Sequence, residues 1–395
     1  MRVAVSITFF FVFILYWLTV KHQQELSTLE GQLGSCHARY EGYNLPVVPR
    51  PEDIEEALSR LGGRWKNLPR DSFGGNSRVN DIISDSSSSS SSGSSSSSSS
   101  STSNRSNSTA AIQRGIPKYI WQTMKEVPRT LPQYSRDMFD NNPGWFAGTM
   151  DDDDVNAFMQ HVFAKTSILW AFRKINPKLG AMKADIWRYA VLYALGGVYI
   201  DADSSFKNKL DSYLKPDDGF VFATESNKYP GCYQEDFYLG SAQYNNEQFL
   251  ATLPFTKYKL VQWMLIARPR HPVMLAALRN IVSIVKHLYL KKPVMLGSTT
   301  NRARLVCTTG PDLLTATMRE VIWKHRNITA GGGSGDSGDG VSDSDMHYRY
   351  VGDDYADMKA VYKEEPRSRH GFNSKGHWSA LVKSGAHLLS SYNTQ

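Results

Sequence analysis

Hydrophobic and polar positions follow two periods between residues 115 and 330, which predicts a chain of both strands and helices. Short apolar runs with polar or glycine borders are typical of strands, and they cover Lys118–Thr123, Trp145–Met150, Gly197–Asp201, Phe220–Thr224 and Gln262–Ala267. Longer stretches that repeat about every 3.6 residues predict helices over Val155–Phe163, Ala181–Leu195, Pro272–Leu290 and Pro311–His325. Because the two kinds alternate, we expect an α/β fold with helices on the faces of a sheet.

The beginning of the chain follows a different pattern. Val3–Val20 carries no charge and is apolar over roughly 18 positions, at the lower end of what crosses a bilayer as a helix. A cleaved signal peptide has a similar plan, but no small-x-small cleavage site precedes Lys21. We therefore favour an uncleaved signal-anchor over residues 1–21, with Arg2 on the cytosolic side and the rest of the chain in the lumen.

A polar stretch over residues 22–113 follows, with a short helix predicted near Glu52–Leu61. It contains a nearly pure serine run at 86–101, which cannot bury enough apolar surface to fold and is typical of a flexible stem. We expect the folded domain over 114–385, with a glycine-rich loop insertion at 331–345, and a tail over 386–395. Asn104, Asn107 and Asn327 begin glycosylation acceptor motifs if the chain is luminal.

Composition narrows the partners only slightly. Hydrophobic residues make up 41% of the chain, enough for a sizeable core, and the formal net charge of +7 is compatible with phosphate-bearing ligands. No nucleic-acid-binding motif or block of basic residues is present, so no nucleic-acid partner is expected. Cys232 and Cys307 could pair in an oxidising lumen, and free thiols at all three cysteines remain the alternative.

The chemistry of the chain points to residues 185–203. Asp185 and Arg188 are three apart on a predicted helix and hence neighbours on one face. Gly196–Gly197 ends that helix, and the strand that follows leads into Asp201 and Asp203, whose side chains alternate to the same side. Two carboxylates there can hold a hard divalent cation, although strand-end aspartates that cap the next segment are the alternative.

Other Asp-x-Asp strings argue for caution about the motif by itself. They lie at 151–154 and 343–345, in acidic or Ser/Gly-rich stretches, and are interpreted as solvated loop carboxylates. What distinguishes Asp201 and Asp203 is their apolar context, because unpaired carboxylates at the end of a hydrophobic strand are costly.

A family resemblance rests on five segments that occur in order: Ile116–Thr123, Asn142–Trp145, Asp185–Asp203, Arg270–Pro272 and Thr309–Pro311. Together they resemble glycosyltransferase family 32, the Asp-x-Asp sugar-binding transferases, over about residues 115–380. The resemblance implies a GT-A-type nucleotide-binding fold with a mixed, mostly parallel sheet and helices on both faces. It also implies retaining chemistry and Mn²⁺, or Mg²⁺, as cofactor.

The resemblance assigns expected roles by position. Asp185 and Arg188 would contact the ribose and the sugar or diphosphate of the donor, and Asp201, Asp203 and His370 would approach the metal. Substrate-binding residues would be Ile120, Trp121 and Gln122 at the base, Tyr199 beside the nucleotide, Gly310 near the acceptor and Trp378 over the donor. Simple alternatives are core packing for Trp121, a plain helix start for Gly310 and an exposed loop for His370. His377 stands where the family usually has serine.

The expected function is a hexosyltransferase of the Golgi or ER membrane, single-pass and type II, with GDP-mannose as donor and a glycan as acceptor. One alternative is a glycolipid hexosyltransferase using GDP-mannose or a UDP-sugar; the single apolar span favours the glycan acceptor. A second alternative is a non-catalytic protein that binds sugar nucleotides, which an intact set of Asp185, Arg188, Asp201 and Asp203 disfavours.

Overall fold

A computed structural model describes residues 45–50, 52–54, 56–57, 115–229, 232, 246–290, 302–330 and 346–362. Its elements in chain order are β1 (Tyr119–Thr123), α3 (Gln133–Asp140), β2 (Phe146–Met150), α4 (Asp152–Val162), α5 (Ser167–Lys174), α6 (Gly180–Ala194), β3 (Gly197–Ile200), β4 (Ser204–Ser205), α7 (Leu210–Tyr213), β5 (Phe220–Lys228), α8 (Glu247–Ala251), β6 (Tyr258–Leu260), β7 (Met264–Ala267), α9 (Pro272–Leu290), α11 (Arg302–Thr308), α12 (Pro311–Ala330), β8 (Tyr348–Asp353), a 3₁₀ turn (Ala356–Met358) and β9 (Val361–Tyr362). All five strands and all four helices predicted between residues 115 and 330 are present.

The predicted signal-anchor, serine run, glycine-rich insertion and tail lie outside the described residues, so these remain predictions. Within the part of the chain that is described, no helix is both long enough and apolar enough to cross a membrane.

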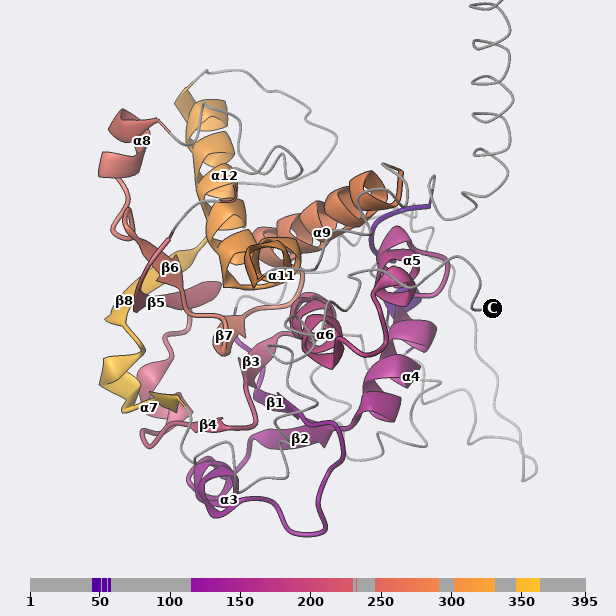
Figure 1. The fold of residues 1–395 in the computed structure, drawn as a ribbon. Helices are drawn as coiled ribbons and strands as arrows, with labels where there is room; N and C mark the ends of the chain where they lie inside the picture. The colour runs from indigo at the N-terminus through magenta and orange to yellow at the C-terminus, as the bar shows by residue number, and fades with distance from the viewer. Residues whose placement is uncertain are drawn as a thin grey trace, which may run out of the picture.

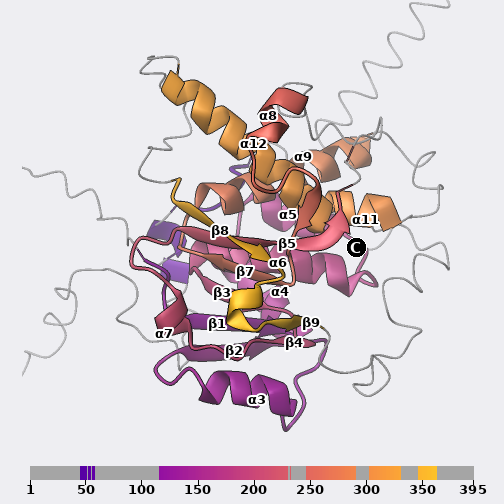
Figure 2. The ribbon, with the colours of Figure 1, turned by 90° about the vertical axis from the view of Figure 1, so that its left-hand side faces the viewer.

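A seven-stranded sheet forms the centre of the domain, in the order β2-β1-β3-β7-β5-β6 with β8 beside β5 (Figures 1 and 2). Strand β1 is parallel to β2 and β3, and β5 is parallel to β8. Strand β7 is antiparallel to β3 and β5, and β6 is antiparallel to β5. Only β6 and β7 therefore run against the other strands of this sheet. The predicted α/β class with a mixed sheet is confirmed.

Each face of the sheet is covered by its own apolar layer. Tyr119, Trp121 and Tyr199 belong to a core that α4, α5, α6, α9 and α12 complete. Their sequence neighbours Ile120 and Val198 point to the opposite face, which α3, α7 and the β4–β9 pair cover (Figure 2). Burial on both faces explains why these strands are continuous apolar runs.

The folded domain also includes residues that were expected to belong to the stem. Ile54 is only 4% exposed and packs into the larger core, together with the partly buried Val47 and Val48. The start of α5 donates its Ser167 amide to the carbonyl of Pro46 at 2.8 Å. The described residues 45–50, 52–54 and 56–57 therefore belong with the folded domain instead of the predicted stem, because Val47, Val48 and Ile54 pack on its core and bury area that a solvated stem would expose.

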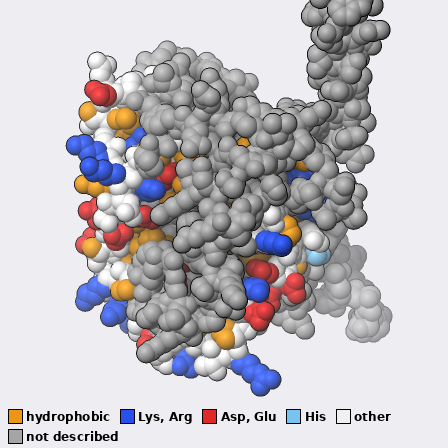
Figure 3. Space-filling view, in the orientation of Figure 1, with side chains coloured by type: hydrophobic (Ala, Val, Ile, Leu, Met, Phe, Trp, Pro, Cys, Tyr) orange, Lys and Arg blue, Asp and Glu red, His pale blue; other side chains and the backbone are white. Residues whose placement is uncertain are grey.

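The acidic string at residues 151–154 was also misinterpreted. Asp151 is the N-cap of α4, and its carboxylate accepts the amide of Asp154 at 2.8 Å in a capping box. Carboxylates in a first helical turn also interact favourably with the helix dipole. These residues start a helix instead of forming a loop. On the face shown in Figure 3, basic and acidic side chains of the described residues lie interspersed.

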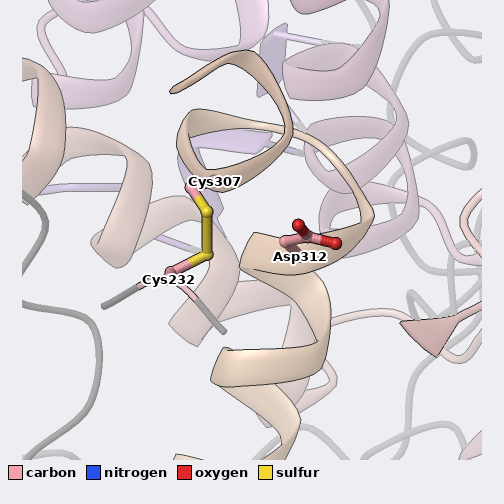
Figure 4. Close-up of side chains that lie close together, drawn as sticks. All are labelled: Cys232, Cys307 and Asp312. Carbon is pink, nitrogen blue, oxygen red and sulfur yellow. A yellow bond between two sulfur atoms is a disulfide. The ribbon is translucent and has the colours of Figure 1, made fainter. Parts of the chain in front are cut away.

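A disulfide joins Cys232 to Cys307, with 5.7 Å between their Cα atoms, which decides between the two possibilities that the sequence left open. Asp312 lies beside it in the first turn of α12, and the three side chains bring ligating atoms within 4.8 Å of one another (Figure 4). Two sulfurs bonded to each other offer no thiolate to a metal. The cluster is therefore a covalent brace between α11 and the segment after β5.

Candidate functional site

The site begins at the turn from α6 into β3, which two glycines make possible. Gly196 and Gly197 have φ angles of 68° and 103°, a region that only glycine adopts without strain. A side-chain carbon on Gly197 would lie 2.7 Å from the carbonyl oxygen of Tyr119, and one on Gly196 would lie 2.7 Å from the nitrogen of Pro269. The close approach sets β3 between β1 and β7 and directs its end toward the carboxyl end of β1, where open α/β sheets bind ligands.

Asp201 and Asp203 lie in the turn between β3 and β4. The strand ends at Ile200, and the amide of Ser204 donates to the carbonyl of Asp201 at 3.0 Å. The prediction that strand alternation sets the two carboxylates on one side was therefore wrong in its reason, because a turn carries them. They are nevertheless close enough for the charge of Asp203 to raise the pKa of Asp201.

Other groups hold this turn in place from several elements. The amide of Asp201 donates to the carbonyl of Trp263 at 2.7 Å, and Tyr134 on α3 donates its hydroxyl to the carbonyl of Ala202 at 2.7 Å. The side-chain amide of Gln122, at the end of β1, lies 3.5 Å from the carbonyl of Asp201. The backbone of the motif is thus fixed without using its carboxylates.

Arg188 joins α6 to the turn by contacting two carboxylates. Its Nη2 lies 2.9 Å from Asp185 Oδ1 and 3.1 Å from Asp201 Oδ1. The guanidinium carbon lies 4.6 Å from the centre of the Tyr199 ring, and the Tyr199 hydroxyl donates to Asp201 Oδ1 at 2.9 Å. The prediction that Asp185 and Arg188 are neighbours on one helix face is confirmed, and the structure brings both together with Asp201.

Three residues that sequence reasoning missed complete this network. Thr309 donates its hydroxyl to Asp185 Oδ2 at 2.9 Å. The Gln262 side chain donates to the Tyr189 hydroxyl at 2.7 Å and to the carbonyl of Thr309 at 2.8 Å. The Gln262 carbonyl accepts Arg188 Nη1 at 2.6 Å. Thr309 belongs to the Thr309–Pro311 segment that carries part of the family resemblance, but nothing in the local sequence around Gln262 pointed to a site.

The break between β6 and β7 explains why Gln262 reaches the network. Both strands pair with the same edge of β5, since Phe220 and Thr224 use their other edge for β8. Residues 261–263 lie between the two strands. The carbonyl of Gln262 accepts a hydrogen bond from Arg188, and that of Trp263 accepts one from the amide of Asp201. One irregular step in a sheet edge thus supplies two acceptors to the site.

The electrostatics of the network reflect its burial. Burial raises the pKa of Asp185 to about 6, although the Arg188 guanidinium and the Thr309 hydroxyl oppose the shift. Burial also raises the pKa of Asp201, with Asp203 adding to it and Arg188 opposing it. For Arg188 burial lowers the pKa, but Asp201 and its other anionic neighbours outweigh it, so the net shift is upward and the group stays charged.

The other predicted substrate-binding residues lie in different environments. Trp121 is fully buried and donates its indole N–H to the carbonyl of Gly196 at 2.8 Å, which favours core packing, and Ile120 is buried in the opposite core. Gln122 lies at the site edge, where its Oε1 is buried with no hydrogen-bond partner among the described residues. Gly310 lies against Val306 before α12, which favours a plain helix start. His370 and Trp378 lie outside the described residues.

The Asn142–Trp145 segment, another part of the family resemblance, holds neighbouring elements together. Asn142 accepts the amide of Leu210 at 2.8 Å through its side chain, and Trp145 donates its indole N–H to Asp211 at 2.9 Å. Lys118 pairs with the same carboxylate at 3.0 Å. These residues bind the start of α7 to β1 and to the loop before β2.

The donor set suits a hard divalent cation. Asp201 and Asp203 each keep one carboxylate oxygen that accepts no hydrogen bond from the described residues, and their mutual repulsion would be relieved by a cation between them. Within the described residues, no third His, Cys, Asp or Glu side chain joins this pair at ligating distance. Further ligands would come from water, from a bound diphosphate or from residues outside that part of the chain.

Comparison with known proteins agrees with this geometry. Residues 128–220 match the family model described as the glycosyltransferase sugar-binding region containing the DXD motif, which confirms the resemblance seen in the motifs. The chain is 26% identical over 222 residues to the initiation-specific alpha-1,6-mannosyltransferase of Schizosaccharomyces pombe, covering 53% of this chain and 50% of the relative.

Two further similarities were found. The initiation-specific alpha-1,6-mannosyltransferase of Candida albicans is 22% identical over 214 residues, covering 52% of this chain and 53% of the relative. The chain thus spans about half the length of these curated relatives. A solved structure titled PaToxG Glycosyltransferase matches 55% of this chain and 74% of its own at 16% identity, with a TM-score of 0.35.

Proposed function

We propose that this protein is a metal-dependent retaining glycosyltransferase with a GT-A-type domain, which moves mannose from GDP-mannose to a glycan acceptor. The observation that carries the proposal is the buried network in which Arg188 bridges Asp185 and Asp201 beside the Asp203 carboxylate. Charged groups with strongly perturbed pKa values at a sheet's carboxyl edge are typical of functional sites. The named mannosyltransferase relatives support the choice of sugar.

Each member of the network has a role in this proposal. Asp201 and Asp203 would hold Mn²⁺ or Mg²⁺ through their carboxylate oxygens, and the cation would supply positive charge to offset that of a diphosphate. Arg188 and Asp185 contact the ribose and the sugar or diphosphate. The Tyr199 hydroxyl donates a hydrogen bond to the Asp201 carboxylate and orients it. Because burial keeps water from screening Arg188, its positive charge acts strongly on a phosphate oxygen nearby.

The transfer step forms one bond and breaks another on the same face of the sugar. The acceptor hydroxyl oxygen bonds to the anomeric carbon, while the bond from that carbon to the phosphate oxygen breaks. The leaving diphosphate receives the electron pair, and one of its oxygens takes the hydroxyl proton. The described residues then serve to orient the donor and to stabilise charge, without a protein nucleophile.

We place this activity in the lumen of the Golgi or the ER, behind a signal-anchor at residues 1–21. The Cys232–Cys307 disulfide supports an oxidising compartment, since disulfides are rare in the reducing cytosol. A glycolipid acceptor would keep the same donor chemistry and differ only in what receives the sugar.

A donor panel with the full-length chain in detergent tests the proposal. We expect Mn²⁺-dependent transfer or hydrolysis of GDP-mannose, loss of activity in excess chelator, and at least about a hundredfold loss for Asp203→Asn. Asp153→Asn is the matched control, because this carboxylate belongs to the first turn of α4, and it retains wild-type activity.

Three results would overturn the proposal. Full activity in chelator, or wild-type turnover by Asp203→Asn, would remove the role of the metal site. A folded protein that binds GDP but neither hydrolyses nor transfers any sugar would be a binding protein. Preference for a UDP-sugar would change the donor and keep the reaction class.

A further inference from the structure

We propose that Thr309 is a positioning residue whose hydroxyl fixes the Asp185–Arg188 pair for the donor. Gln262 supports the same pair through hydrogen bonds to Thr309 and to Arg188. This inference rests on the proposed function, since it concerns the same site. Thr309 bonds to Asp185, and Arg188 links Asp185 to Asp201, so Thr309 acts on the metal-binding end of the site through these two residues.

The hydroxyl of Thr309 controls the orientation of the Asp185 carboxylate. It donates to Oδ2 at 2.9 Å, while Arg188 Nη2 lies 2.9 Å from Oδ1 on the other side. A carboxylate held at both oxygens cannot rotate about its terminal bond without losing a charge-assisted hydrogen bond. Asp185 therefore presents one fixed oxygen to Arg188, and Arg188 in turn is held at Asp201 Oδ1.

The backbone of Thr309 closes a ring of hydrogen bonds with the same arginine. Its carbonyl accepts the Gln262 side-chain amide at 2.8 Å and the Tyr189 hydroxyl at 3.1 Å. The Gln262 carbonyl accepts Arg188 Nη1 at 2.6 Å. Arg188 is thus linked to Thr309 twice, once through Asp185 and once through Gln262. The two paths therefore restrain the guanidinium at both Nη1 and Nη2.

The corner that carries Thr309 is anchored independently of the site. Cys307, two residues earlier, is bonded to Cys232, and Asp312, three residues later, pairs with Lys259 of β6 at 2.7 Å (Figure 4). Gly310 packs on the backbone of Val306, where a side-chain carbon would lie only 2.7 Å away. Thr309 is fully buried in this corner. Its hydroxyl is therefore set in place before a donor arrives.

Thr309→Val and Thr309→Ser form a matched pair that tests the inference. Valine keeps the volume and removes the hydroxyl, whereas serine keeps the hydroxyl. We expect Thr309→Val to raise the donor KM or the GDP dissociation constant about ten- to a hundredfold, as for a lost hydrogen bond to a charged group. Thr309→Ser restores values close to wild type, and the acceptor KM stays unchanged in both.

Thr315→Val is the control for the loss of a buried threonine hydroxyl. Thr315 lies in α12 and bonds to the carbonyl of Pro311 and the amide of Leu260, away from Asp185. Melting temperatures of all variants show how far folding is affected, and Thr309→Ala gives a second measurement if valine does not fold.

The outcomes separate the inference from the proposed function. Weak donor binding in Thr309→Val, restored by serine and absent in Thr315→Val, supports the positioning role. Equal donor parameters in Thr309→Val and wild type, or a loss that only parallels the fall in melting temperature, would overturn it while the transferase remains. A wild-type protein that neither binds GDP nor transfers sugar would overturn the proposed function and the inference with it.

Discussion

Two arginines of this domain stack on a tyrosine and pair with aspartate, yet they differ in how fully they are paired. Arg349 on β8 lies 5.1 Å from the Tyr213 ring centre and donates through Nε at 2.7 Å and Nη2 at 2.5 Å to the two oxygens of Asp218. The pair is bidentate and complete, and it fastens β8 to the loop before β5. Such closed geometry is typical of a structural ion pair.

Arg188 is arranged differently. It lies 4.6 Å from the Tyr199 ring centre, but its Nη2 is shared between Asp185 and Asp201, and its buried Nε has no hydrogen-bond partner among the described residues. One oxygen of Asp201 is also left without a hydrogen bond from these residues. Two carboxylates around one guanidinium, with donors and acceptors to spare, are costly for stability and suited to a polar ligand. The difference distinguishes a site from a brace.

The strongest way to break this comparison is to replace each arginine by lysine. Arg188→Lys keeps the charge but loses the planar guanidinium, which stacks on Tyr199 and donates through Nη1 to Gln262 while Nη2 contacts both carboxylates. We therefore expect a loss of about 10²–10³ in kcat/KM for the donor. Arg349→Lys loses one bond of a bidentate pair, and we expect a loss of roughly 1.5–3 kcal/mol of stability with activity retained. Donor kinetics and chemical denaturation of both variants measure the two effects.

The comparison fails if the effects are exchanged. An active Arg188→Lys protein with lowered stability would make Arg188 a structural residue. An inactive but stable Arg349→Lys protein would extend the site to β8.

The fold was largely predictable because its core strands are apolar on both faces and its long helices have clear periods. Short elements without that signal were missed, among them α3, α5 and β8. The helix α3 has only Ser135 and Met138 buried, so its pattern is weak. Val47, Val48 and Ile54 were assigned to a stem because these isolated apolar residues find their partners only in the tertiary structure.

The site was predictable where its residues are near in sequence. Asp185 and Arg188 share a helix face, and the glycine pair Gly196–Gly197 predicts the turn that leads to Asp201. Gln262 joins the site through a break in a sheet edge, which depends on how β6 and β7 pair with β5 and leaves no local signal. Trp121 shows the opposite limit, since an aromatic residue in a strand that leads to the site fits a core as well as a pocket.

The pH dependence of stability tests whether the Asp185 carboxyl beside Arg188 is costly to ionise. Its pKa is about 6 in the folded protein and about 3.8 as a free side chain, so the folded state binds the extra proton between these values. Ionised Asp185 therefore lowers stability above pH 6, and this cost is relieved as the pH falls toward 4. In chelator, we expect wild type to gain up to about 3 kcal/mol relative to Asp185→Asn between pH 7 and pH 4.

Urea denaturation of both proteins across this pH range provides the measurement. Asp201 titrates in both and largely cancels in the difference. A difference that is constant with pH, or one that grows in favour of Asp185→Asn as the pH falls, would contradict a carboxyl whose pKa is raised by burial.

The smallest effect is expected from the two tyrosines beneath the arginines. Tyr199→Phe keeps the ring under Arg188 and removes the hydroxyl that donates to Asp201 at 2.9 Å. Because burial raises the pKa of Tyr199 well above its usual value, the hydroxyl stays protonated and remains a donor at any working pH. We expect about a three- to tenfold loss in kcat/KM for the donor, less than for Thr309→Val, because Arg188 Nη2 still contacts the same oxygen of Asp201. Tyr213→Phe beneath Arg349 leaves donor kinetics unchanged, and equal losses in both variants would mean that the two tyrosines act only by packing.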